Sequence, residues 1–394
     1  MSFERLYNIV EEELHLSSLR QISRTKDIHS TLLGNEEVRE ILEIETPMAE
    51  NISETLEVSK GRVYAVRFDK TFGETGFKKP VIASLILKRL IESVKRGVFS
   101  KKWIDGGNVN SSLALGYYAK KFNGEATYIM SRFFPEYVLD YVKETSQNSI
   151  DIIKAPNLKL GIERDFYKYL VNLIRFDKKF KKYQPLWHAK FSGEYSEVLG
   201  QELANSLNFC PDYIVVAVGA GSTLEGQAIP IKREFNNSPK IIVPEHAKSA
   251  LLHSSQPLVN VFENSIDNKE YPASWFSNPP EGIPHYVIGP HYDEINPLLK
   301  KSILAEIDGV YTYYDDDWKQ LSYECYNKSM EIGNSSAANL FIAKTLADQG
   351  SNVLTFIYEP FRSFYRGHNV SIENYAVSNH FFDLNDRSSI CFQK

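Results

Sequence analysis

Short apolar runs alternate with segments of helical periodicity along most of this chain. The runs rich in β-branched or aromatic residues predict strands at 62–67, 126–130, 150–153, 213–218, 240–244, 285–288, 309–313 and 352–358. Between them, apolar residues recur every three or four positions and predict helices at 81–96, 113–122, 195–207, 318–330 and 337–348. Strands that alternate with helices are typical of a parallel sheet covered by helices. The pattern therefore predicts an α/β fold.

The first 58 residues differ from the rest, because they are polar, acidic and only weakly periodic. We expect them to form an added arm or a small cap. The chain has 394 residues and 43% apolar content, which is enough for two globular lobes that share a cleft. Its net charge of -5 is small for this length, so no overall field attracts nucleic acid or an anionic membrane. Small molecules are the expected partners.

The cysteines and the N-terminus predict a reducing, cytoplasmic location. Cys210, Cys325 and Cys391 lie far apart and form no C-x-x-C pair, which argues against a disulfide framework and against a zinc site. The N-terminus lacks the basic start and apolar core of a signal peptide, and no later run has membrane-spanning length. The basic run at 175–182 is typical of a solvated helix end. We expect a soluble cytoplasmic protein that binds neither metal, membrane nor nucleic acid.

The most specific chemical signal is the segment VVAVGAGSTLEG at 215–226, where an apolar run ends in small residues that open a helical pattern. Gly219 and Gly221 let backbone N–H groups approach an anion, and Ser222 and Thr223 add hydroxyls beside the positive end of the helix dipole. The segment matches neither a P-loop nor a G-x-G-x-x-G fingerprint. By itself it is as compatible with a plain turn as with a phosphate site.

Three further segments open helical patterns with small or polar residues. Lys78 lies in GFKKP, where the positive end of a helix favours the neutral amine that can attack a carbonyl. The segment DGGNVNSS at 105–112 could hold a carboxylate, although an N-cap explains it almost as well. GNSSAA at 333–338 also resembles a serine N-cap. Four such loops in this order are much more specific than any one of them.

Together these segments resemble the fold-type II enzymes that use pyridoxal phosphate, in particular the cysteine synthase and cystathionine β-synthase group. GFKKP at 76–80 is similar to the family's lysine motif, which implies that Lys78 is the Schiff-base lysine. GNVNSSLALG at 107–116 is similar to the family's TSGNTGIALA, which implies that Asn110 bonds the cofactor's phenolic oxygen. The same match implies that the substrate carboxylate is bound by Asn108, Ser111 and Ser112.

The remaining matches concern the cofactor's phosphate and ring. GAGSTLEG at 219–226 is similar to the family's GxGGTLxG, which implies phosphate binding by Gly219, Ala220, Gly221, Ser222 and Thr223. GNSSAA implies that Ser335 is the neutral partner of the pyridine nitrogen, and VIG at 287–289 implies that Gly289 lies beside the ring. The resemblance covers roughly 55–370 and implies a homodimer with the two-lobed, tryptophan synthase β-subunit-like fold. We expect an extension at 1–58, a larger lobe at 59–100 and 190–394, and a smaller mobile lobe at 101–189 with the substrate carboxylate loop.

The activity that this resemblance implies is β-replacement on an O-activated L-serine through an aminoacrylate, with sulfide, ammonia or another nucleophile. Pro80, Val109 and Gly107 depart from the family pattern in the part that recognises substrate, so the substrate stays open. A serine or threonine dehydratase that performs β-elimination is the alternative enzyme, and a non-catalytic cofactor-binding protein is the alternative from another class. A loosely aligned segment that lines the family's cleft contains Trp187, His188 and Lys190.

Overall fold

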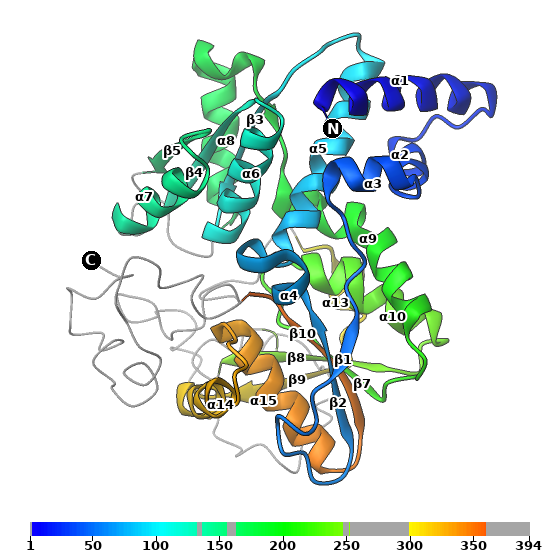
Figure 1. Cartoon of the computed structure of the whole chain (residues 1–394), viewed down its shortest axis with the longest axis vertical. Helices are drawn as coiled ribbons and strands as arrows, with labels where there is room; N and C mark the ends of the chain where they lie inside the picture. The colour runs from blue at the N-terminus through cyan, green and yellow to red at the C-terminus, as the bar shows by residue number, and fades with distance from the viewer. Residues whose placement is uncertain (1, 132–135, 156–162, 247–251, 253–298, 360–394) are drawn as a thin grey trace.

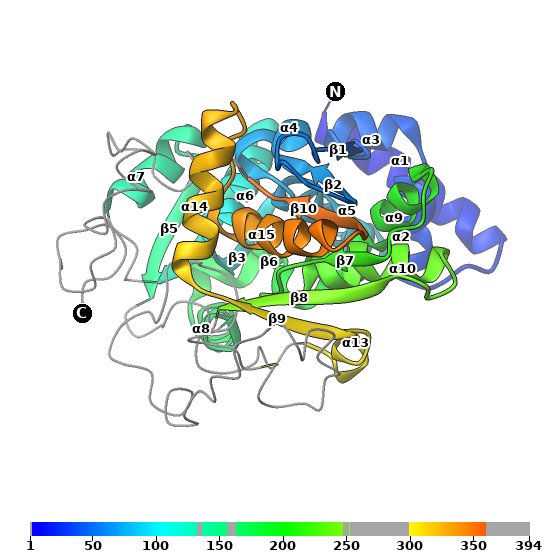
Figure 2. The same ribbon diagram turned by 90° about the horizontal axis from the view of Figure 1, so that it is seen from below.

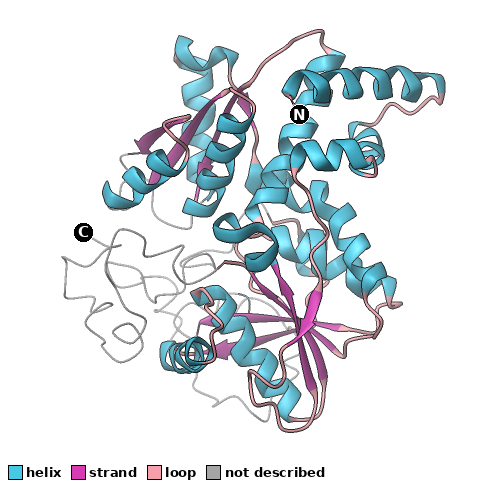
Figure 3. Ribbon diagram, viewed as in Figure 1, coloured by secondary structure: helices cyan, strands magenta, loops and turns pink. Residues whose placement is uncertain are grey.

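Two open sheets, each flanked by helices, make up the described part of the chain (Figures 1 and 3). The computed structural model describes all residues except 1, 132–135, 156–162, 247–251, 253–298 and 360–394. The larger sheet has the strand order β1-β2-β10-β7-β8-β9, in which only β1 is antiparallel to its neighbour, and the smaller sheet is the all-parallel β5-β4-β3-β6. The strands are β1 Ala49–Asn51, β2 Arg62–Arg67, β3 Lys102–Gly107, β4 Glu125–Ser131, β5 Ile150–Ala155, β6 Gln184–Pro185, β7 Tyr213–Val215, β8 Lys240–His246, β9 Gly309–Tyr313 and β10 Asn352–Ile357.

The helices connect these strands and cover their faces. Those in the first half of the chain are α1 Phe3–Leu19, α2 Thr25–Leu33, α3 Glu36–Leu42, α4 Phe68–Phe72, η1 Gly73–Thr75, α5 Lys78–Lys95, α6 Val109–Lys121, α7 Glu136–Thr145 and α8 Glu163–Phe176. Those in the second half are η2 Lys178–Lys182, α9 His188–Ser206, η3 Leu224–Ala228, α10 Ile229–Glu234, α13 Lys301–Leu304, α14 Asp315–Asn327 and α15 Asn334–Asp348. Among the described residues, no helix combines the length and apolarity that a membrane span requires.

The larger sheet is buried on both faces, which explains why its strands are almost continuously apolar. On β10, Val353 and Ile357 pack into a cluster that includes residues of α14 and α15. Leu354 and Phe356, which alternate with them, pack into the cluster formed with α5 and α9. Figure 2 shows these two layers of helices on opposite sides of the sheet.

The N-terminal segment, which the sequence predicts to be an added arm or a small cap, forms three helices. On α1, Phe3, Leu6 and Val10 follow helical spacing and are fully buried, so the helix has a narrow apolar stripe that faces the core. Helices α1 and α2 pack on α5, α2 also packs on α9, and α3 packs on α1 and α2. One hydrophobic cluster thus runs from these helices to both sheets.

The structure confirms the predicted helices but starts each of them earlier than the sequence pattern does. For example, α5 begins at Lys78 and α6 at Val109, because a first turn carries polar residues that interrupt the apolar periodicity. Strands β1, β3 and β6 were not predicted, and residues 105–107, expected in a loop, belong to β3. The predicted strand at 213–218 ends at Val215, where the chain leaves the ladder toward the glycine loop. The strand at 285–288 lies outside the described residues, and the division into lobes stays a prediction.

Candidate functional site

The loop that carries Lys78 lies against the end of β10. Lys78 is the first residue of α5, which follows α4 and η1 after β2. Gly76 has a φ of +48°, and a Cβ at this position would lie 1.9 Å from the backbone oxygen of Tyr358. Only glycine lets the loop approach that closely. The backbone therefore holds Lys78 beside the C-terminal edge of the larger sheet.

The start of α6 contains the residues expected to bind the substrate carboxylate. Asn108 is the N-cap, and its Oδ1 accepts hydrogen bonds from the backbone N–H of Ser111 at 3.0 Å and from the Ser111 hydroxyl at 2.9 Å. The hydroxyl of Ser112 donates to the backbone oxygen of Val109 at 2.7 Å. Both serines are fully buried. These polar groups hydrogen-bond within the helix start, so their role toward substrate stays a prediction.

Asn110, on the same turn, faces the end of β10. Its Nδ2 donates to Oε2 of Glu359 at 3.4 Å. Its Oδ1 is buried and has no hydrogen-bond partner among the described residues. A buried amide oxygen without a hydrogen-bond donor lowers the stability of the fold, unless a further group donates to it.

The glycine loop after β7 leads into the short π-helical turn η3. Gly221 has a φ of +81°, Ser222 and Thr223 are buried, and the hydroxyls of Ser222 and Ser192 form a short hydrogen bond. Gly219 and Ala220 are half-buried. Gly226 has a packing role, because a Cβ there would lie 2.1 Å from Oγ of Ser196 on α9.

The start of α15 meets the same end of β10. Gly333 is its N-cap, and the half-buried Ser335 lies in its first turn. The backbone N–H of Gly333 donates to the backbone oxygen of Glu359 at 2.9 Å, and the hydroxyl of Ser336 accepts from the backbone N–H of Tyr358 at 2.9 Å. These bonds join the predicted ring-nitrogen segment to β10. Gly289, predicted beside the ring, lies outside the described residues.

Tyr358 and Glu359 connect all four predicted loops, although no sequence motif marks either residue. The Tyr358 hydroxyl lies 3.5 Å from the backbone oxygen of Ala217 and hydrogen-bonds to Thr223, at the two sides of the glycine loop. Glu359 is 6% exposed and contacts Asn110, and its charge interacts with that of Lys78. Burial raises the pKa of Glu359 to about 7, against the opposing effect of Lys78 and with a contribution from Asp69.

A second buried polar group lies beneath the carboxylate loop. Oδ2 of Asp105, on β3, lies 3.2 Å from Nδ1 of His188 and accepts from its backbone N–H at 3.1 Å, and both side chains are fully buried. A Cβ at Gly107 would lie 3.2 Å from Nε2 of His188. The imidazole therefore occupies the space that a larger residue at 107 would need. The Nζ of Lys190 lies 5.1 Å from the ring centroid of Phe191, and the role of Trp187 and Lys190 in the cleft stays a prediction.

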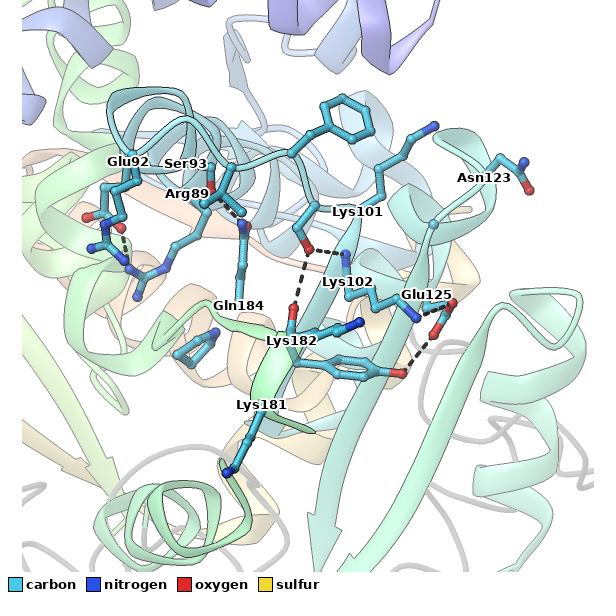
Figure 4. Close-up of a pocket in the computed structure, with 17 residues that line it drawn as sticks. Arg89, Glu92, Ser93, Lys101, Lys102, Asn123, Glu125, Lys181, Lys182 and Gln184 are labelled. Atoms are coloured by element: carbon cyan, nitrogen blue, oxygen red, sulfur yellow. Dashed lines mark hydrogen bonds and ion pairs between the residues drawn. The ribbon is translucent and has the colours of Figure 1, made fainter. Parts of the chain in front are cut away.

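A separate cavity of about 760 Å³ lies at the other end of α5 (Figure 4). Because α5 has 18 residues, its ends are about 27 Å apart, so this cavity is remote from Lys78. Its lining includes the basic residues Arg89, Arg96, Lys101, Lys102, Lys181 and Lys182. Figure 4 shows Arg89 paired with Glu92 and Lys102 paired with Glu125, so part of this charge is already neutralised. Within the described residues, no cluster of His, Cys, Asp and Glu could hold a metal ion.

Comparison with known proteins identifies the architecture. No family model and no curated protein sequence matches the chain. Among solved structures, it is similar to an O-ureido-L-serine synthase, with a TM-score of 0.61 and 14% identity over 86% of this chain and 98% of that one. It is also similar to a hydrogen sulfide-producing enzyme in complex with an α-aminoacrylate intermediate, with a TM-score of 0.60 and 17% identity over 86% and 94% of the two chains.

The chain has the fold of these enzymes. The two-sheet, fold-type II architecture predicted from the sequence is thereby confirmed, and the similarity extends over nearly the whole length of both neighbours. At these identities, the comparison establishes the fold, whereas activity depends on the site residues.

Proposed function

We propose that the protein is a pyridoxal-phosphate-dependent enzyme that replaces the β-substituent of an O-activated L-serine by sulfide, ammonia or another nucleophile. The observation that carries this proposal is the meeting of four helix-opening loops at Tyr358 and Glu359, with Lys78 in their midst. The names of the structural neighbours support it, since one forms O-ureido-L-serine and the other holds an α-aminoacrylate intermediate.

The residues present fit the cofactor. Asn110 has a buried Oδ1 without a partner among the described residues and an Nδ2 aimed at the site, so its amide is suited to a polar ligand. The positive φ of Gly221 directs the chain into η3. The backbone N–H groups of the loop from Gly219 to Gly221 would bind an anion, such as the phosphate of the cofactor. When bound, the cofactor would withdraw electrons from the substrate's α-carbon.

The protein's own groups would then bind and move protons. Lys78 would hold the cofactor's aldehyde carbon through its Nζ and, once displaced, would accept the substrate's α-proton. Ser335 would face the ring nitrogen, and the start of α6 would orient the substrate carboxylate with its backbone N–H groups. We further propose a cytoplasmic homodimer, on the family resemblance and on the widely spaced cysteines.

The proposal is tested by loading the purified protein with pyridoxal phosphate, reducing it with borohydride and mapping the modified peptide by mass spectrometry. We expect the label on Lys78. Lys79→Ala is a matched control, because the adjacent lysine pairs with Glu43 at 2.7 Å. It should label normally, whereas Lys78→Ala should not. Absence of labelling, or labelling elsewhere, would remove the cofactor assignment.

The reaction is tested by adding O-acetyl-L-serine to the loaded protein and following its visible spectrum and its products. A spectral change with release of acetate, followed by incorporation of sulfide or an amine, would support β-replacement. Formation of keto acid and ammonia regardless of added nucleophile would instead favour a dehydratase. A loaded protein that reacts with no amino acid would favour a non-catalytic role.

A further inference from the structure

Glu359 is a buried carboxyl group that the reaction outlined above does not use. It is the second residue after β10 and is 6% exposed. Its Oε2 lies 3.4 Å from Nδ2 of Asn110, and its Oε1 lies 2.6 Å from the position that a Cβ on Gly333 would take. The carboxyl group thus lies between the start of α6 and the start of α15. Under the proposed function, these helix starts face the phenolic oxygen and the nitrogen of the cofactor ring.

The charged groups around the carboxyl group of Glu359 come from two neighbouring elements. Lys78, on α5, attracts its negative charge, whereas Asp69, on α4, repels it. Asp69 is itself held by Arg67 through two hydrogen bonds of 2.8 and 2.6 Å. Tyr358 is also adjacent, and burial raises the pKa of its phenol above the ordinary value, so it carries no charge at neutral pH. The ionised carboxylate of Glu359 and the protonated amine of Lys78 therefore stabilise each other.

Glu359 contacts Asn110 and interacts electrostatically with Lys78, and the cofactor would need both of these groups. Asn110 Nδ2 would donate to the cofactor's phenolic oxygen, but it already donates to Glu359. Lys78 must be neutral to attack the aldehyde carbon, and a nearby carboxylate favours the protonated amine. In that attack a C=N bond forms, and the aldehyde oxygen leaves as water with the two protons of the amine.

We propose that Glu359 is a positioning residue that restrains cofactor loading while it is ionised, by holding Asn110 and by keeping Lys78 protonated. The inference rests on the proposed function, because Lys78 and Asn110 receive their roles there. A protonated Glu359 no longer attracts the charge of Lys78 and accepts only a weaker, uncharged hydrogen bond from Asn110, so loading by the wild-type protein should be least restrained below neutral pH. Its pKa of about 7 puts the change between pH 6 and pH 8.

The test measures the rate at which the apoprotein incorporates pyridoxal phosphate, followed by its visible absorption between pH 6 and pH 8. The ratio of the Glu359→Gln rate to the wild-type rate should be about one at pH 6 and rise to roughly tenfold at pH 8, as the carboxyl group of the wild-type protein ionises. Glu359→Asp, which keeps the charge on a shorter side chain, should give an intermediate ratio. Glu92→Gln is the matched control, since Glu92 pairs with Lys88 at 2.5 Å near the far end of α5 and should load as wild type.

The possible results separate this inference from the proposed function. Wild-type protein that never labels Lys78 would refute the proposed function itself. Normal wild-type loading with a Glu359→Gln ratio that is below one, or that is the same at every pH, would overturn the role of Glu359 and leave the enzyme assignment in place. Urea unfolding midpoints of the four proteins separate a change in folding from a change in charge, because a folding defect would slow loading at every pH.

Discussion

Replacing Gly76 by alanine should move the loop that carries Lys78 away from β10. Gly76 has φ +48° and ψ -144°, and Gly73, three residues earlier, has nearly the same conformation with φ +58° and ψ -136°. An alanine at either position is strained by about 1–3 kcal/mol. The surroundings differ, because a Cβ on Gly73 meets nothing within 4 Å, whereas one on Gly76 lies 1.9 Å from the backbone oxygen of Tyr358.

This difference allows the displacement to be estimated. Ordinary contact begins at 3.4 Å, so the loop must retreat from β10 by about 1.5 Å to accept a methyl group at Gly76. A misplacement of about 1 Å can reduce catalysis by about 100-fold. We therefore expect Gly76→Ala to lower kcat/KM for β-replacement by about two orders of magnitude. Gly73→Ala should lose stability but keep activity within a few fold.

The assay pairs urea unfolding with steady-state kinetics and with borohydride labelling of Lys78 in both variants. Unfolding measures the strain that the two substitutions share, and the kinetics measure the displacement that only Gly76→Ala should cause. Equal kinetic losses in the two variants would refute the reasoning, because they would mean that the contact with Tyr358 does not position Lys78.

Three further predictions concern stability and are checked by urea unfolding. Partial burial by itself raises the pKa of Glu43, but hydrogen bonds from lysines 121 and 79 and from a tyrosine outweigh it and lower the pKa to about 2. Because this side chain is 37% exposed, Glu43→Gln should cost about 1–2 kcal/mol at pH 7, and the difference should vanish as the pH falls from about 4.5 to about 2. A difference that persists at pH 2 would contradict the ionic explanation. Asp105→Asn should cost about 1–3 kcal/mol, because the carboxylate that accepts from the backbone of His188 is fully buried, and no loss would argue against that contact. Leu354→Ala should cost about 2–5 kcal/mol by leaving a cavity in β10, and a loss below 1 kcal/mol would mean that the core closes around it.

Local sequence pattern predicts most of the elements because burial on both faces makes a strand continuously apolar. β10 is an example, with Val353 and Leu354 on opposite faces and both fully buried. The sequence pattern does not predict β3, because Asp105 and two glycines make up half of its residues, a composition typical of a turn. The buried Asp105 is satisfied by backbone N–H groups, including that of His188, which is 83 residues away in the chain. A periodicity analysis cannot detect such a distant partner.

The same limit applies to the residues of the candidate site. Each loop carries its own signature of small residues before a helix, so Lys78, Asn110 and the glycine loop are visible one at a time. Glu359 has no such signature. Its importance follows from the strand order, because β10 lies between β2 and β7 and its carboxyl end is therefore central. That order depends on pairing between residues 62–67 and 352–357, almost 300 positions apart. An acidic residue two positions after a buried parallel strand is thus a site candidate only once the neighbours of that strand are known.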